Sequence, residues 1–134
     1  MTRIADTSFL YAAFDEADAR HKTTRDELAK PQAVAIPLCV LAEFLDLVEY
    51  RHDRSTAMQV HEDLEKLATV SIAEFDDEPA VVALWAQHPK LSMADAAGVQ
   101  ACLENNATLL SYDTDQLAAL ETMRTGKPSK TKAA

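Results

Sequence analysis

The sequence predicts a three-layer α/β/α domain with a central, mainly parallel sheet of about four to five short strands. Short β-type segments alternate with longer helical ones along the chain, which favours a parallel sheet covered by helices on both faces. The composition, 48% hydrophobic and 26% charged with only two Gly and five Pro, is typical of a helix-rich globular protein. The 134 residues fit one domain, expected over residues 1–124, with a disordered basic tail over residues 125–134.

The first strand is expected to be a stub, Ile4-Ala5, which leads into a helix over the apolar residues 9–14. Residues 17–30 are mostly charged and good helix formers, and Pro31 ends them, so an exposed helix is expected there. Residues 33–36 form the second strand, which ends at Pro37.

A strongly apolar helix is expected over residues 38–50 and should be buried. Its apolar side is predicted to carry Leu38, Leu41, Leu45 and Val48. Ser55 can cap the following helix. The side chains of that helix expected to face inward are Met58, Leu64 and Leu67.

The third strand is expected over residues 69–72, and the fourth over residues 108–111. Between them lie two helix candidates, residues 78–87, which stop before Pro89, and a second that runs from Ser92 to about Glu104. A short helix over residues 116–120 follows, and no final strand is evident after it.

The formal net charge of −9 excludes a protein that holds nucleic acid by a basic surface alone. Divalent cations held by clustered carboxylates could bridge this acidic protein to phosphate. No apolar run approaches the ~20 residues that span a bilayer, so a cytoplasmic protein is expected. Cys39 and Cys102 sit in apolar settings without a CxxC partner, which indicates buried thiols and argues against zinc.

Several acids lie where strands end or the next helices begin. Asp6 follows the first strand, Asp95 stands in the first turn after Ser92, and Asp113 and Asp115 follow the fourth strand. Each has an ordinary alternative as a helix cap: Asp6 as an N-cap, Ser92 and Asp95 as a capping box, and Asp113 or Asp115 as the cap of the last helix. Their joint placement at one edge of a parallel sheet is what points to function.

Glu43 differs because its helical neighbours are mostly apolar: Cys39, Val40 and Leu47, with only Asp46 polar. A lone carboxylate there costs several kcal/mol unless it is paired, protonated or bound to a cation. A buried ion pair, or a carboxylate that reaches out at the helix edge, remains the alternative to a functional role. Clustered carboxylates of this kind suit Mg²⁺ or Mn²⁺, which bind phosphate oxygens.

Four short motifs together resemble those of the PIN-domain ribonucleases, specifically the VapC-type toxins of bacterial toxin-antitoxin pairs, over nearly all of residues 3–120. They are Asp6-Thr7-Ser8, Leu41-Ala42-Glu43-Phe44, Leu91-Ser92-Met93-Ala94-Asp95-Ala96 and Ala107-Thr108-Leu109-Leu110-Ser111-Tyr112-Asp113. Each motif is short, but their order and the separations of 37, 52 and 18 residues between the four acids make the combination fairly specific.

The resemblance implies a PIN-like fold and endoribonuclease activity. It implies that Asp6, Glu43, Asp95 and Asp113 are catalytic and hold Mg²⁺ or Mn²⁺, with Asp115 competing for the fourth position. Ser8 and Ser111 would be polar supports. The implied partners are an RNA substrate and a cognate antitoxin, and the implied assembly is a homodimer or a toxin-antitoxin hetero-oligomer, with no membrane association.

Two other classes of function are weighed against this one. A phosphoryl-accepting receiver domain fits poorly, because Asp46 and Asp53 fall on or beside a helix and the required Lys does not follow the last strand. A PIN-like module that binds a partner or RNA without cutting keeps the fold and loses only the activity. Clusters of basic residues at 20–25 and 51–54 could contact an RNA backbone, although such runs are usually solvated helix faces.

Overall fold

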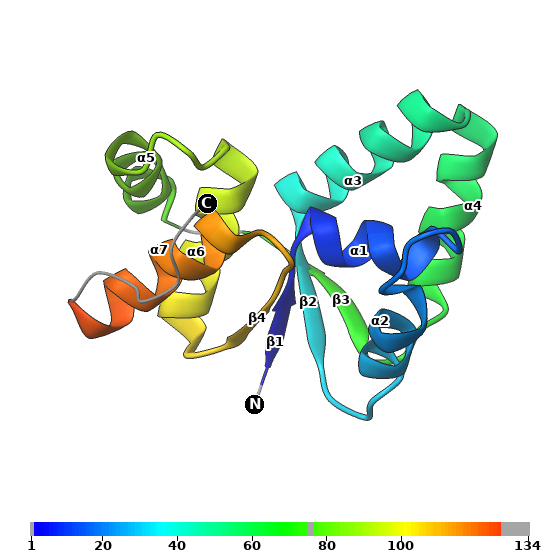
Figure 1. Cartoon of the computed structure of the whole chain (residues 1–134), viewed down its shortest axis with the longest axis horizontal. Helices are drawn as coiled ribbons and strands as arrows, with labels where there is room; N and C mark the ends of the chain where they lie inside the picture. The colour runs from blue at the N-terminus through cyan, green and yellow to red at the C-terminus, as the bar shows by residue number, and fades with distance from the viewer. Residues whose placement is uncertain (1, 75–76, 127–134) are drawn as a thin grey trace.

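The computed structural model describes residues 2–74 and 77–126. Its strands are β1 (Arg3–Ala5), β2 (Val34–Pro37), β3 (Val70–Ala73) and β4 (Thr108–Leu110). Its helices are α1 (Thr7–Phe14), α2 (His21–Leu28), α3 (Leu38–Arg51), α4 (Arg54–Glu65), α5 (Glu78–Gln87), α6 (Met93–Asn105) and α7 (Thr114–Thr125). The prediction of a three-layer α/β domain is confirmed (Figure 1).

The sheet has four strands in the order β3-β2-β1-β4, and every pairing is parallel. The chain therefore moves outward from β1 to β3, then crosses back to place β4 on the other side of β1. In open parallel sheets, ligands gather outside the carboxyl ends of the two strands at which the strand order reverses. Here these strands are β1 and β4, and we call the region outside their carboxyl ends the carboxylate crevice.

Two hydrophobic cores cover the two faces of the sheet, and side chains alternate between them along each strand. Ala5 and Leu110 face the core formed with α1 to α4, whereas Ile4 and Leu109 face the core formed with α5 to α7. Figure 1 shows these two groups of helices on opposite sides of the sheet. This alternation explains how β1, only three residues long, can sit at the centre of the sheet.

Arg3 gives the central strand a polar residue, yet its side chain is buried. The guanidinium donates to the carbonyl oxygens of Glu27, at 2.6 Å, and Gln32, at 2.9 Å, and forms an ion pair with the Glu27 carboxylate at 3.1 Å. These bonds satisfy most of a group that would otherwise be costly to bury. Arg3 thereby ties the connection from α2 to β2 onto β1.

Three helix predictions need correction. Only His21–Leu28 of residues 17–30 is helical, because the segment before it turns around Asp18, whose carboxylate accepts from the backbone N–H of Arg20 at 2.7 Å. Asp53, not Ser55, caps α4 by accepting from the Thr56 N–H at 2.6 Å. The last helix is longer than expected and reaches Thr125.

Several predicted inward-facing side chains are also on the wrong face. Leu38, Met58 and Leu67 are exposed, whereas Leu45 is partly buried and packs against the core as predicted. The buried faces carry instead Val40, Leu41, Phe44 and Val48 on α3, and Ala57, Val60 and Leu64 on α4. The buried positions recur at helical spacings of three and four residues, and Leu41, Val48 and Leu64 of the prediction lie on these faces.

Cys102 is buried as expected, but Cys39 is exposed on the first turn of α3. Within the described residues, α7 is the last element after β4, and no helix there is long and apolar enough to cross a membrane. The predicted basic tail lies outside the described residues from residue 127 onward.

Candidate functional site

Asp6 lies at the carboxyl end of β1, in the crevice between β1 and β4. It is the N-cap of α1, because its Oδ2 accepts from the Ser8 backbone N–H at 3.2 Å and from the Ser8 hydroxyl at 2.9 Å. Its other oxygen, Oδ1, is buried and has no hydrogen-bond partner, and the residue is 2% exposed. A buried carboxylate oxygen without a donor is costly, so this atom calls for a cation or a solvent partner.

The two predicted polar supports, Ser8 and Ser111, connect Asp6 to the segment that follows β4. The Ser111 Oγ lies 3.2 Å from Asp6 Oδ2, while the Ser8 Oγ accepts from the Tyr112 N–H at 2.9 Å. The Asp6 N–H also donates to the Leu110 carbonyl at 3.0 Å. The ends of the two neighbouring strands are therefore held together through Asp6.

Asp95 projects from the first turn of α6. The predicted capping box is present: the Asp95 N–H donates to the Ser92 hydroxyl, and the Asp95 carboxylate accepts from the Ser92 N–H, both at 3.1 Å. The pKa of Asp95 is raised to about 6, first by burial and then by the charges of Asp6 and Asp113, against the opposing hydrogen bonds from Ser92. Asp6 and Asp113 are thus close enough to Asp95 for their charges to act on it.

Asp113 and Asp115 have different surroundings. Asp113 caps α7, since its Oδ1 accepts from the backbone N–H groups of Asp115, at 2.9 Å, and Gln116, at 3.2 Å. Asp115 lies 3.9 Å from the ammonium of Lys90. The charge of Asp113, and not that of Asp115, contributes to the raised pKa of Asp95.

Glu43 is half-buried on α3 and reaches the site through Thr7, the residue after Asp6. The Thr7 hydroxyl donates to Glu43 Oε1 at 2.6 Å. No ion pair of Glu43 occurs among the described residues, so the buried ion pair considered as an alternative is not found. Glu43 is therefore linked by one hydrogen bond to the residue that follows Asp6.

Gln116 is a site residue that the sequence analysis missed. It has no exposed surface, and its side chain bonds both to Ser111 and to the backbone of Asp95. A signal for it existed, because Gln116 shares the buried face of α7 with Ala119 and Leu120 at helical spacings of three and four residues. A polar residue on such a face must find partners, and here they belong to the site.

The donor set fits a divalent metal ion of the magnesium type. Mg²⁺ and Mn²⁺ prefer carboxylate oxygens and keep several waters, and Asp6, Glu43, Asp95 and Asp113 offer only such oxygens. The Asp6 Oδ1 has no hydrogen-bond partner, and the raised pKa of Asp95 shows that its negative charge is unfavourable there. A bound cation would stabilise both carboxylates. In the part of the chain that the structure describes, no three His, Cys, Asp or Glu side chains already form a ready-made metal cage.

The guanidinium of Arg20 packs against the aromatic ring of Tyr112. The guanidinium carbon of Arg20 lies 4.1 Å from the centre of the Tyr112 ring, and both Arg20 Nε and one terminal nitrogen reach Asp18 at 3.2 Å. The Tyr112 ring stacks on Phe9, and its hydroxyl is 2.6 Å from that of Thr24. Tyr112 lies between Ser111 and Asp113 in the chain, so Arg20 is held against the segment that carries Asp113.

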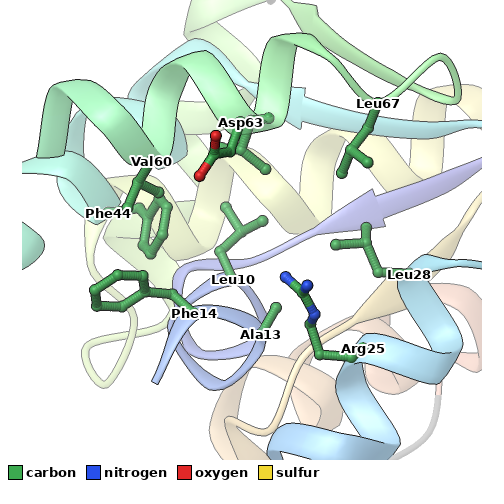
Figure 2. A pocket seen from close by; sticks show the side chains of 10 residues that line it. Leu10, Ala13, Phe14, Arg25, Leu28, Phe44, Val60, Asp63 and Leu67 are labelled. Atoms are coloured by element: carbon green, nitrogen blue, oxygen red, sulfur yellow. The ribbon is translucent and has the colours of Figure 1, made fainter. Parts of the chain in front are cut away.

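An apolar groove of about 220 Å³ lies between α1, α2 and α4, and none of the four acids lines it. Figure 2 shows its apolar wall, which includes Leu10, Phe14 and Leu28, together with the charged side chains of Arg25 and Asp63. This groove and the carboxylate crevice are separate features of the molecule.

Comparisons with known proteins agree with this architecture. The family model described as PIN domain matches residues 3–121. Among solved structures, the VapC20 toxin of Mycobacterium tuberculosis, described as a sarcin-ricin loop cleaving toxin, shares 22% identity with a TM-score of 0.73, covering 87% of this chain and 94% of that one. No curated protein sequence matches the chain.

Two further structures contain toxin-antitoxin pairs. A toxin-antitoxin complex from Klebsiella pneumoniae is 21% identical with a TM-score of 0.62, covering 87% of this chain and 90% of that one. VapBC2 from Rickettsia felis, bound to a DNA fragment from their promoter, is 17% identical with a TM-score of 0.62 and 92% coverage of both chains. At these identities the likeness shows a common fold.

Proposed function

The chain belongs to the PIN domain family, and from this membership we propose that it is the toxin of a toxin-antitoxin pair, a divalent-metal-dependent endoribonuclease. The observation that carries the proposal is that Ser111 and Gln116 join the chain segments of Asp6, Asp95 and Asp113. Burial, with the charges of Asp6 and Asp113, raises the pKa of Asp95, and one buried oxygen of Asp6 has no partner. A role as helix caps alone would not require these acids to lie near one another.

In the proposed site, Asp6, Glu43, Asp95 and Asp113 hold Mg²⁺ or Mn²⁺, which would supply charge neutralisation and Lewis-acid activation for hydrolysis of an RNA phosphodiester. We assign the fourth position to Asp113 because Asp115 faces Lys90 and is not among the charges acting on Asp95. Ser8 and Ser111 are the proposed polar supports: Ser8 donates to Asp6, the Ser111 Oγ lies 3.2 Å from the same carboxylate oxygen, and Thr7 donates to Glu43. Each acid thus has a defined neighbour that limits its movement.

The proposed substrate is an RNA, and Arg20 is proposed to contact its backbone. The acidic chain repels polyanions as a whole, so a fixed guanidinium at the rim of the crevice would have a disproportionate effect on where the RNA lies. Tyr112 and Asp18 restrict Arg20 to one place before the RNA arrives, which reduces the entropy lost on binding.

The proposed partner is a cognate antitoxin, supported by the two related folds solved as toxin-antitoxin complexes. The groove between α1, α2 and α4 is the proposed contact surface, since apolar walls with a charge of each sign at Arg25 and Asp63 suit a short amphipathic segment of that partner. The proposed assembly is a homodimer or a toxin-antitoxin hetero-oligomer in the cytoplasm.

The test is cleavage of total cellular RNA by the purified protein with Mn²⁺, with Mg²⁺ and with EDTA. We expect cleavage only with metal, and a loss of at least about 100-fold in Asp6→Asn and Asp95→Asn, because each removes a charge from the proposed metal site. Asp26→Asn is the matched control, since Asp26 is exposed and pairs with Lys22. Sequencing of the cleaved ends would identify the RNA.

Undiminished cleavage by both site variants would contradict the mechanism. Absence of cleavage, together with unchanged thermal stability on addition of metal, would favour the non-catalytic PIN-like binding module instead.

A further inference from the structure

Gln116 is the most completely buried polar side chain near the crevice, and its two ends have different partners. Its Nε2 donates to the Asp95 carbonyl oxygen at 3.1 Å, and its Oε1 accepts from the Ser111 hydroxyl at 2.7 Å. Its backbone N–H also donates to Asp113 Oδ1 at 3.2 Å. One residue therefore touches the three chain segments that carry Asp6's support, Asp95 and Asp113.

These partners allow only one orientation of the amide group. A carbonyl oxygen only accepts hydrogen bonds, so the nitrogen of Gln116 must face Asp95 and its oxygen must face Ser111. At 2.7 Å, two oxygens need a hydrogen between them, and Ser111 is the only one of the pair that has a hydrogen to give.

Gly98 makes room for this arrangement. A Cβ at position 98 would lie 3.0 Å from Gln116 Nε2, which is closer than carbon and nitrogen atoms normally pack. Because the amide is bonded at both ends, it has little freedom to withdraw. The absence of a side chain at position 98 therefore serves Gln116, besides the packing against Leu109 at 4.0 Å.

The direction of the Ser111 hydroxyl matters for Asp6. Ser111 has one hydrogen, and its Oγ also lies 3.2 Å from Asp6 Oδ2 and accepts from the Asp113 N–H at 3.0 Å. While the hydrogen is given to Gln116, it is not available to Asp6. A carboxylate that accepts fewer hydrogen bonds donates more strongly to a cation.

We propose that Gln116 is a positioning residue that draws the Ser111 hydroxyl hydrogen away from Asp6 and so keeps the Asp6 carboxylate available to a divalent cation. The inference rests on the proposed function, because it assumes the metal site there. It adds a residue that touches neither the metal nor the RNA and acts through Ser111.

The test is Mn²⁺ affinity, measured by calorimetry on full-length protein without RNA. In Gln116→Met the side chain keeps its length but loses both bonds, so Ser111 turns its hydrogen to Asp6 and we expect Mn²⁺ affinity to fall about tenfold or more. Gln59→Met, an exposed glutamine on α4, is the control and should leave the affinity unchanged.

A double-mutant cycle separates this role from a general loss of packing. When Ser111 is replaced by Ala, no hydroxyl remains for Gln116 to orient, so Gln116→Met should then change the affinity by less than about twofold. An equal tenfold loss in both backgrounds would overturn the proposal. If Gln116→Met fails to fold, Gly98→Ala provides the second route, because it displaces the amide of Gln116 and should also weaken Mn²⁺ binding.

The outcomes distinguish the inference from the function on which it rests. Wild-type protein that binds no Mn²⁺ overturns both. Wild-type protein that binds Mn²⁺ as tightly as Gln116→Met, or as tightly as a folded Gly98→Ala, overturns only the role of Gln116.

Discussion

At the scale of single residues, three aspartates combine a helix-capping role with the metal-binding role proposed for them. Asp6 and Asp113 each cap a helix and Asp95 completes a capping box, and the same three carboxylates also converge on one crevice. A cap fixes the carboxylate by backbone N–H groups, which leaves its remaining lone pairs directed away from the helix. Helix capping therefore holds these carboxylates in place for the metal binding proposed for them.

The raised pKa of Asp95 predicts a pH-dependent cost in the metal-free protein. With a pKa of about 6 when folded and about 4 when unfolded, the folded state holds the extra proton between these values, so stability falls as pH rises through that window. Asp95→Asn removes the charge but keeps an oxygen for the Ser92 N–H. We expect this variant to be more stable than wild type by about 1 kcal/mol near pH 7.5, a figure discounted for partial solvent exposure.

Urea unfolding in EDTA at roughly pH 4 and pH 7.5 measures this difference, with Asp26→Asn as the control. At the lower pH the two proteins should have nearly equal stability, since Asp95 is then protonated in the folded state. A variant that is less stable than wild type at the higher pH would show that ionised Asp95 does not destabilise the metal-free protein.

At the scale of elements, α2 is where the sequence was least informative and where the structure adds most. The predicted helix over residues 17–30 is shortened by the turn at Asp18, and that turn is what holds Arg20 against Tyr112. Helix propensity alone cannot detect such a turn, because an Asp carboxylate competes for the backbone N–H groups of the residues that follow it.

The placement of Arg20 predicts a binding effect separate from chemistry. Arg20→Ala should raise KM for RNA several-fold with little change in kcat. The slope of the logarithm of the binding constant against the logarithm of the salt concentration should also become shallower by about 1. Lys22→Ala is the matched control, because Lys22 is a cation two residues from Arg20, in the first turn of α2, and its side chain is 88% exposed and pairs with Asp26. Steady-state kinetics over a range of salt concentrations would measure both. Equal effects of the two substitutions would mean that only net charge matters.

At the scale of the whole molecule, the carboxylate crevice and the apolar groove lie on different parts of the surface. We therefore expect the proposed RNA cleavage and the proposed antitoxin binding to respond to different substitutions. The groove is formed by α1, α2 and α4, whose packing around one of the two cores leaves its walls partly open to solvent (Figure 2).

This separation predicts that Leu67→Glu weakens antitoxin binding without affecting RNA cleavage. Leu67 lines the groove and is 39% exposed, so the substitution should be tolerated by the fold while placing a charge against an apolar partner. The measurement is co-purification with the product of the neighbouring small open reading frame. Met58→Glu, at an exposed position of α4 outside this groove, should retain the partner. Loss of the partner from both variants would place the contact elsewhere.

The sequence by itself determined the order of strands and helices, the parallel sheet, and the arrival of Asp6, Asp95 and Asp113 at strand ends or helix starts. These features follow from local periodicity and from residues that end a helix or strand, such as Pro31 and Pro37, and both signals act over a few neighbouring residues. The tertiary structure alone decided the strand order β3-β2-β1-β4, which places the ends of β1 and β4 side by side.

Only the tertiary structure, too, buried Gln116 between Ser111 and Asp95, linked Glu43 to Thr7, and raised the pKa of Asp95. Apart from the bond between Ser111 and Gln116, which are near in the chain, these features depend on contacts between segments more than 20 residues apart or on burial by several elements together. Strand pairing and electrostatic repulsion are non-local, and no periodic pattern in a single segment records them.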